Sequence, residues 1–298
     1  MSEPDRKADT LEVDLSEWSA AASGNPQVER ERQATEVFLA ALGMTQTCQD
    51  KIYLKGGILV GAIYASGRNT ADMDFSTTST PDITFPETLS EELQAAFPRA
   101  AAQLGVPNLR LKMQSVKFRP RKNTFAESDF PAVEAKFAYA LDGSKQQAAL
   151  EAGTCPDVLY ADISFNEPIS CVQTVKMKGA NSEILVYSLH DLVAEKLRAL
   201  LQQITRDRYR RQDVFDLYYL MENAHVSNIP KELLLRTFRE KCASRGIEPT
   251  QQSLDDDEVR RRASSEWGTL SREVDVLPDF DTAYNAVSEL YRSLPWAE

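Results

Sequence analysis

Histidine is scarce in this sequence of 298 residues, which contains only His190 and His225. So few imidazoles argue against catalytic-triad chemistry and against a histidine-rich metal site. Its four cysteines are scattered, with no C-x-x-C pair, which argues against a disulfide framework or a zinc site and favours reduced thiols in the cytoplasm. No apolar run approaches the length that spans a bilayer, and the first ten residues have no signal-peptide character. We therefore expect a cytoplasmic protein without a membrane partner.

The composition is that of a soluble globular protein, with 42% apolar and 27% charged residues. A net charge of −11 argues against a nucleic-acid partner, because phosphate contacts come from lysine and arginine. The charge is uneven, however: residues 109–123 hold six basic residues and no acidic one, and residues 206–211 hold four arginines and one aspartate. Either run is a local basic patch that steers an anionic substrate or a solvated charged face.

The periodicity of apolar residues predicts an α/β part followed by a helical part. We expect a loosely held arm or short helix over residues 1–26, an α/β domain over 27–187 and a helical domain over 188–298. Helices are predicted at residues 28–42 and 90–104, with Ser90 as N-cap, and then at 189–204, with Ser188 as N-cap. Further helices are predicted at 211–223, 231–245 and 281–294, with one more starting in the acidic run 255–258. Strands are predicted within 51–77 and at 109–118, 135–141, 158–165, 172–178 and 184–187.

The stretch from Lys55 to Phe75 organises the expected site. It starts with Gly56-Gly57, continues through an apolar run of about two helical turns, and ends in a strand that contains Asp72 and Asp74. Side chains in a strand repeat every two residues, so both aspartates point to one face. Paired carboxylates repel each other, and a divalent cation such as Mg²⁺ removes that cost. Glycines just upstream allow a backbone to approach a phosphate closely.

The pattern G-G, short helix, R-x-T-x-D-x-D-F resembles the core of the nucleotidyltransferase superfamily, and most closely the AbiEii/AbiGii-type toxins. The resemblance implies an α+β fold with a polymerase β-like mixed-sheet domain, followed by a helical domain that completes the active site. It also implies that Gly56 and Gly57 cradle the triphosphate and that Arg68 and Thr70 bind the nucleotide. Gly57 stands where the commonest family pattern has serine, so a hydroxyl contact is lost. The alternative is an ordinary strand–turn–helix with an exposed acidic strand.

Nucleotidyl transfer by such a family needs a third metal-binding carboxylate beside Asp72 and Asp74. Asp162 is the candidate, because alternation over residues 158–165 buries Leu159 and Ile163 on one face and turns Asp162 to the other. It projects alongside the two aspartates if the strands are neighbours. An edge-strand acid without a metal is the alternative.

Two helical motifs extend the resemblance. Lys196 lies inside the apolar arc of the helix at 189–204, in a segment that resembles the family's A-E-K-L-x-A-L motif, whose lysine contacts the nucleotide or serves the active site. Snorkelling to solvent is the alternative. The next helix carries Asp213 and Asp216 where the family has R-D-x-x-D-L, with Arg211 one residue before the usual arginine. The resemblance implies that Asp213 is a general base or orients the lysine and that Asp216 is more structural; a helix salt-bridge role for both is the alternative.

Together these features predict a Mg²⁺-dependent nucleotidyltransferase, with a two-metal site, that transfers NMP from an NTP to an acceptor and releases pyrophosphate. By resemblance it is a growth-inhibiting toxin opposed by an antitoxin, and tRNA is the favoured acceptor. Two alternatives stay open. The acceptor is a small molecule or a protein hydroxyl, which the acidic net charge favours, or the chain is a non-catalytic descendant that binds a nucleotide or a partner.

Overall fold

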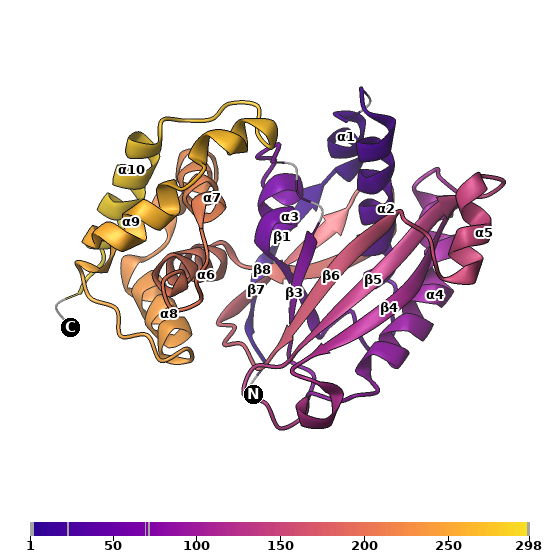
Figure 1. Ribbon diagram of the computed structural model, residues 1–298, viewed down its shortest axis with the longest axis horizontal. Helices are drawn as coiled ribbons and strands as arrows, with labels where there is room; N and C mark the ends of the chain where they lie inside the picture. The colour runs from indigo at the N-terminus through magenta and orange to yellow at the C-terminus, as the bar shows by residue number, and fades with distance from the viewer. Residues whose placement is uncertain (1–2, 23, 69, 71, 297–298) are drawn as a thin grey trace. The chain divides into compact units, whose positions relative to one another are not determined.

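A computed structural model describes residues 3–22, 24–68, 70 and 72–296 (Figure 1). Several residues of the predicted segments lie outside the described ones. They are residues 1–2 and 23 of the predicted arm, Asn69 and Ala71 of the stretch from Lys55 to Phe75, and residues 297–298 of the predicted helical domain. The chain forms two compact units. The first contains Met1–Leu59, Ala71–Glu167 and Val172–Val186, and the second contains Val60–Thr70, Pro168–Cys171 and Tyr187–Glu298. The second unit therefore includes two short segments from the predicted α/β domain.

The first unit is built on an eight-stranded mixed sheet in the order β1-β7-β8-β2-β3-β6-β5-β4. β2 pairs in parallel with β8 and antiparallel with β3; β3 pairs in parallel with β6; β6, β5 and β4 are successively antiparallel. The strand bounds are β1 Asp5–Val13, β2 Ile52–Lys55, β3 Asp72–Thr77, β4 Leu109–Arg119, β5 Ala132–Leu141, β6 Val158–Phe165, β7 Cys171–Met177 and β8 Ser182–Tyr187. The mixed sheet agrees with the predicted α+β fold.

One face of this sheet forms the core of the first unit. Phe38 of α2 (Pro26–Leu42) packs against Phe75 of β3, Phe137 of β5 and Phe97 of α4 (Phe85–Gln103), with ring centroids 4.8–6.3 Å apart. All of these rings are buried. Because strand side chains alternate between faces, the residues between these apolar positions turn to the opposite face of β3, β6 and β5. We call this opposite face the polar face. The first unit also contains α1 (Leu15–Ala20), α3 (Gly56–Ile58) and α5 (Lys145–Ala152).

The second unit is helical, with α6 Leu189–Gln202, α7 Arg211–Asn223, α8 Lys231–Ala243, α9 Asp257–Ser264 and α10 Phe280–Arg292. α6 packs against α7, α8 and α9, and α7 packs against α10. The Ser188 side chain accepts a hydrogen bond from the backbone N–H of Asp191, so the predicted N-cap of α6 is confirmed. A π-helical turn, Leu59–Ile63, continues α3 where the chain leaves the first unit.

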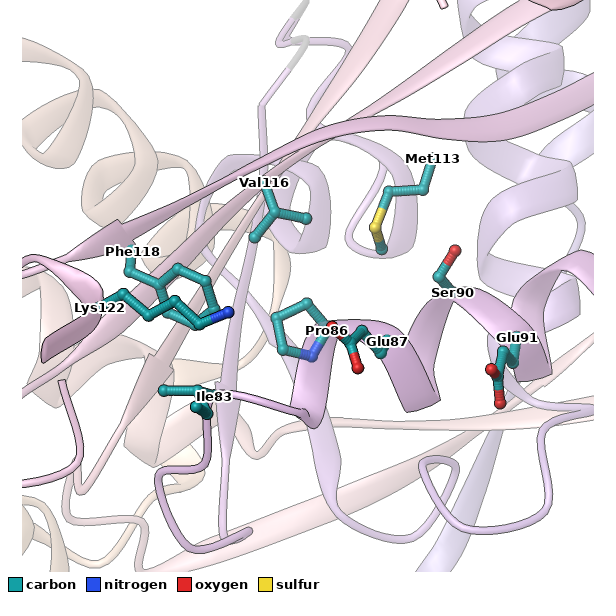
Figure 2. Close-up of a pocket in the computed structure, with 9 residues that line it drawn as sticks. All are labelled: Ile83, Pro86, Glu87, Ser90, Glu91, Met113, Val116, Phe118 and Lys122. Carbon is teal, nitrogen blue, oxygen red and sulfur yellow. The ribbon is translucent and has the colours of Figure 1, made fainter.

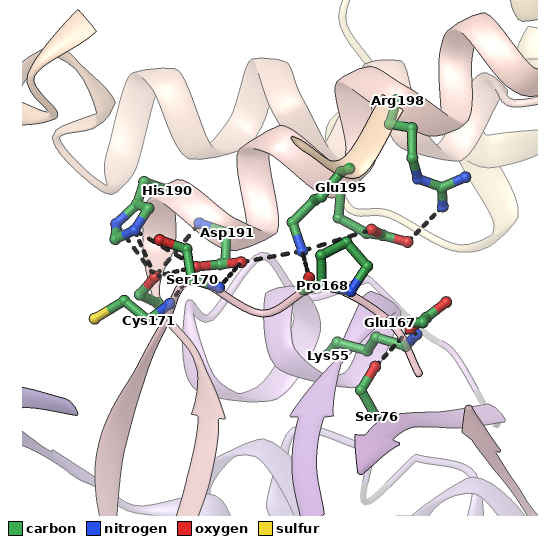
Figure 3. A network of polar contacts seen from close by, with 12 residues as sticks. Lys55, Ser76, Glu167, Pro168, Ser170, Cys171, His190, Asp191, Glu195 and Arg198 are labelled. Atoms are coloured by element: carbon green, nitrogen blue, oxygen red, sulfur yellow. Dashed lines mark hydrogen bonds and ion pairs between the residues drawn. The ribbon is translucent and has the colours of Figure 1, made fainter. Parts of the chain in front are cut away.

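A buried polar network fixes the segment 168–171 within the second unit (Figure 3). The carboxylate of Asp191 accepts hydrogen bonds from the backbone N–H groups of Ser170, at 3.1 Å, and Cys171, at 2.7 Å. Lys241 of α8 forms an ion pair with Asp191 at 3.0 Å and donates to the carbonyl of Pro168 at 2.8 Å. Both side chains are almost fully buried, so the network satisfies charges that would otherwise destabilise the fold.

Two predictions about local structure are wrong. Residues 5–13 form the edge strand β1 instead of an arm, although the following residues do form the short helix α1. Most side chains of β1 are exposed, so backbone pairing holds the strand and no apolar alternation marks it. Helix α4 begins at Phe85, and Ser90 lies inside it. Pro86 occupies the first turn of α4, where the fixed φ of proline favours a helix.

Candidate functional site

The carboxylates expected to bind metal lie on the polar face of the first unit. β3 and β6 are neighbouring parallel strands, and Asp74 is directly opposite Asp162. Met73 and Ile163 in the flanking positions are buried, which turns both aspartates to the polar face. Asp72, two residues before Asp74, is exposed on the same face, opposite Tyr160. The structure therefore brings the three predicted carboxylates together on two adjacent strands.

The same row contains two charged residues that the sequence analysis did not identify. Glu134 of β5 is directly opposite Asp162, and Lys55 of β2 is directly opposite Asp74. The alternation of Glu134 with buried neighbours is visible in the sequence, but the register that aligns Glu134 and Lys55 with the aspartates is not. Lys55-Asp74-Asp162-Glu134 is thus one row of charged side chains across four strands.

Arg119, at the end of β4, neutralises part of this row. Its guanidinium forms an ion pair with Asp162 and lies 2.8 Å from Oε1 of Glu134. Burial raises the pKa of Asp162, and the nearby positive charge of Arg119 opposes part of that rise. The other oxygen, Oδ1 of Asp162, is buried and accepts no hydrogen bond from any described residue. A buried oxygen of this kind is costly unless a donor or a cation satisfies it.

The carboxylates fit a magnesium site in chemical type and in their common face. Hard carboxylate oxygens are the ligands that Mg²⁺ prefers, and the unsatisfied oxygen of Asp162 is available to one. In the part of the chain that the structure describes, however, no three His, Cys, Asp or Glu side chains converge on one point as a ready metal site. The carboxylate side chains would therefore have to rotate to bind one metal ion together. For Asp162, such a rotation would change its ion pair with Arg119.

Gly56 makes the close approach of Asp74 possible. Its φ of +71° lies in the left-handed region, which favours glycine. A Cβ atom at this position would lie 2.9 Å from both Cβ and Cγ of Asp74 and closer still to its Oδ2. The adjacent Gly57 is buried in α3. The glycine pair thus starts the short helix directly beside the Asp74 carboxylate.

Lys55 connects this region to a second buried acid (Figure 3). Its ammonium forms an ion pair with Glu167, whose carboxylate also accepts a 2.6 Å hydrogen bond from Ser76 Oγ of β3. All three side chains are buried. The signal for Lys55 in the sequence is its place directly before the glycine pair, whereas Glu167 is distant in the chain and carries no signal.

The remaining predicted residues belong to the second unit, where three of them, Arg68, Lys196 and Asp213, form a buried ion cluster with Asp216. Lys196 Nζ lies 2.6 Å from Asp216 Oδ2 and 3.1 Å from Asp213 Oδ1. Arg68 Nε lies 3.0 Å from the other oxygen of Asp216. Lys196 and Asp216 are 4% and 0% exposed, so Lys196 does not snorkel to solvent. The cation that the two aspartates require is thus supplied by Lys196, with Arg68 beside it.

The electrostatics of this cluster keep Lys196 and Asp213 charged. Burial lowers the pKa of Lys196, but Asp216 and Asp213 raise it more, so its net shift is upward. Burial raises the pKa of Asp213, but Lys196 and Arg210 lower it more, so its net shift is downward. Arg211 lies elsewhere in the unit, in an ion pair with Glu266 at 3.7 Å.

Thr70 is half-buried and is flanked on both sides by residues outside the described ones. The candidate residues therefore form two groups. Gly56, Gly57 and the three aspartates at 72, 74 and 162 belong to the first unit, and the residues at 68, 70, 196, 211 and 213 belong to the second.

No helix among the described residues combines the length and the apolar character that crossing a membrane requires. Comparison of the sequence with curated proteins finds no match. The structure resembles that of MenT4, a nucleotidyltransferase toxin from Mycobacterium tuberculosis H37Rv, with 14% identity and a TM-score of 0.53 over 94% of this chain and 88% of that one. It also matches JHP933 from Helicobacter pylori, with 12% identity and a TM-score of 0.49 over 91% and 92% of the two chains.

The MenT4 match bears on the fold alone, because the two sequences share so few residues. The family comparison covers most of the sequence: residues 37–286 match the model of the nucleotidyl transferase AbiEii toxin of type IV toxin–antitoxin systems. The matched range includes every candidate site residue in both units. This chain therefore belongs to the AbiEii family of nucleotidyltransferase toxins.

Proposed function

We propose that the protein transfers NMP from an NTP to an acceptor, releases pyrophosphate and thereby inhibits growth. The supporting observation is the direct opposition of Asp74 and Asp162 on the polar face, with one buried oxygen of Asp162 unsatisfied. Two acidic side chains that lie opposite each other on a sheet destabilise it. A cation that binds during the reaction would remove that cost. An antitoxin is the partner that the family implies.

The residues of the polar face have distinct roles in this proposal. Asp72, Asp74 and Asp162 hold Mg²⁺, as a two-metal site, and the metal supplies the charge that stabilises the transferring phosphoryl group. Gly56 leaves room for the Asp74 carboxylate. With Gly57 it also exposes backbone for the triphosphate. Arg119 pairs with Asp162 and Glu134 and so positions the Asp162 carboxylate on the polar face.

For the second unit we retain the roles that the family resemblance implies. Lys196, Arg68 and Arg211 supply positive charge for the nucleotide, and Thr70 also binds it. Asp213 orients Lys196, a role supported by their 3.1 Å contact and the low exposure of both side chains. We also propose that the protein acts in the cytoplasm, which is supported by its free cysteines, Cys48, Cys155, Cys171 and Cys242.

We propose tRNA as the acceptor, supported by the residues beside the carboxylates. Tyr160 is 43% exposed opposite Asp72, and Lys136 lies over its ring at 5.2 Å from the centroid. Lys117 of β4 continues the polar face opposite Glu134 and is exposed. An exposed aromatic ring beside an exposed lysine is a typical surface for an unstacked base and its phosphates.

The test incubates purified protein with Mg²⁺, total bacterial tRNA and each of the four NTPs labelled at the α-phosphate. Asp72→Ala serves as the control, because Asp72 is exposed and its removal leaves the core intact. We expect label on tRNA with the wild-type protein and none with the variant. Label on the protein itself would move the acceptor to a protein hydroxyl. Equal transfer by wild type and Asp72→Ala would refute the catalytic assignment.

A further inference from the structure

An open groove lies in the first unit between the start of α4 and β4, the strand at one edge of the sheet (Figure 2). It has a volume of about 420 Å³. Pro86 and the 41% exposed Ile83 line it on the helix side, and Met113, Val116 and Phe118 line it on the strand side. Exposed apolar side chains gathered around a hollow are unusual on a protein that needs no partner there.

The two faces of β4 have opposite chemical character. Val116 and Phe118 are opposite the buried residues Ala135 and Val133, so they lie on the core face and line the groove. Lys117, between them, is opposite Glu134 on the polar face. Residues 110, 112 and 119 are also basic and exposed. One side of this strand is therefore apolar and the other is cationic.

The outer edge of β4 is available for backbone pairing. β4 has 11 residues and ends the strand order, and none of the described strands pairs with its outer side. Proteins often place lysines on such an edge to prevent aggregation. That role explains the cations but not the apolar groove on the other face of the same strand. The two features together specify a ninth strand whose side chains alternate in the same way.

We propose that the edge of β4 binds an extended segment of a partner protein in which apolar and acidic residues alternate. The segment pairs with β4 through backbone hydrogen bonds. Its apolar side chains enter the groove beside Ile83 and Phe118, and its acidic side chains lie beside Lys112 and Lys117. A second copy of this chain fits poorly, because pairing β4 with itself brings like charges together. RNA would pair with the basic side chains of β4 but would leave the apolar groove exposed to water.

This inference does not depend on the proposed function, because binding is measured without nucleotide or RNA. The probe is a fluorescent synthetic peptide in which isoleucine alternates with glutamate, titrated with full-length protein and followed by fluorescence anisotropy. We expect saturable binding that weakens at least about tenfold in Ile83→Ser and in Lys117→Glu, since each removes a contact worth about 1.4 kcal/mol or more. Val276→Ser and Lys231→Glu are matched controls, because both side chains are exposed in the second unit.

Backbone methylation of the peptide tests the strand pairing itself. Methyl groups on the amides along one edge of the peptide should abolish binding, and the same number along the other edge should not, because only one edge pairs with β4. Equal loss with both methylated peptides would refute strand pairing. Binding by a peptide with lysine in place of glutamate would refute the charge match. Binding of tRNA but not of the acidic peptide, with loss in Lys117→Glu, would assign this surface to RNA and overturn the proposal.

Discussion

Gly56→Ala tests the local geometry on which the proposed metal site depends. The substitution adds one methyl group next to the Asp74 carboxylate, at a position where φ is +71°. The added Cβ would lie 2.9 Å from Cβ and Cγ of Asp74, closer than non-bonded carbons approach. Either the carboxylate rotates or β3 shifts. Each change moves Asp74 away from its position opposite Asp162.

Two effects of this substitution differ in size and in readout. The left-handed backbone conformation costs an alanine about 1–2 kcal/mol, which lowers the melting temperature by roughly 2–8 °C in a protein of this size. Displacement of a catalytic group by about 1 Å costs on the order of a hundredfold in rate. We therefore expect a modest loss of stability and a large loss of nucleotidyl transfer, measured by calorimetry and by the labelling assay with tRNA.

Gly153→Ala is the matched control. Gly153 also has a φ of +71°, at the end of α5, but a Cβ there would meet no atom within 4 Å. Gly153→Ala should lose only the stability that the backbone conformation costs, Gly56→Ala should lose at least as much, and only Gly56→Ala should lose transfer. If the two variants retain equal activity, the contact between Gly56 and Asp74 does not matter to the reaction and the argument fails.

Two further predictions concern buried charges. Burial raises the pKa of Glu36 from an ordinary value of 4.5 to about 7, so the folded state holds a proton that the unfolded chain has released. The free energy of unfolding should therefore fall by up to about 3 kcal/mol as the pH rises from about 4.5 to 7, and this slope should be smaller in Glu36→Gln. Urea titrations at several pH values measure it, and identical slopes would contradict it. Asp216→Asn should cost about 3–5 kcal/mol, because it removes the charge of the fully buried carboxylate that Lys196 and Arg68 share; a loss below about 1 kcal/mol would contradict this.

Most of the fold prediction rested on the period-two alternation of apolar and polar residues in strands and on the N-cap residues of helices. The strand predicted at 158–165 is β6, and the helix predicted at 211–223 is α7, with the same bounds. Both segments have a strong local pattern, since one face is buried and the other is polar. β1 has no such pattern, because the pairing that holds it comes from a strand more than 150 residues away. Local reasoning fails where a distant backbone supplies the stabilising contacts.

The site residues also divide into those that local sequence pattern predicts and those that depend on distant contacts. Alternation alone placed Asp72 and Asp74 on one face and turned Asp162 away from a core. The neighbours Glu134 and Arg119 were missed, because strand register and the reach of a long side chain are tertiary properties. Lys196 shows a different case: its place in an apolar arc signalled an unusual lysine, the family resemblance suggested Asp213 as its partner, and the structure adds the buried Asp216 at 2.6 Å.

The contacts of Arg119 lead to a prediction about the order of binding. One guanidinium bridges Oδ2 of Asp162 and Glu134, so a metal that takes both oxygens of Asp162 must displace it. Bare Mg²⁺ gives the displaced arginine no new anionic partner, whereas Mg²⁺ bound to an NTP brings phosphate oxygens that pair well with a guanidinium. Calorimetry should therefore detect little binding of Mg²⁺ alone and clear binding of Mg²⁺ with an NTP analogue that cannot transfer its α-phosphate.

Arg119→Ala should reduce this difference, because Asp162 is then released from its internal cation and Mg²⁺ alone should bind several-fold more tightly than it does to the wild type. Lys117→Ala is the matched control, since Lys117 pairs with Glu134 at 3.3 Å and, among the described residues, forms no ion pair with Asp162. Tight binding of Mg²⁺ alone to the wild-type protein, or equal metal affinity in wild type and Arg119→Ala, would show that the arginine does not compete with metal. Arg119 would then be a surface cation, and the unsatisfied oxygen of Asp162 would need a different explanation.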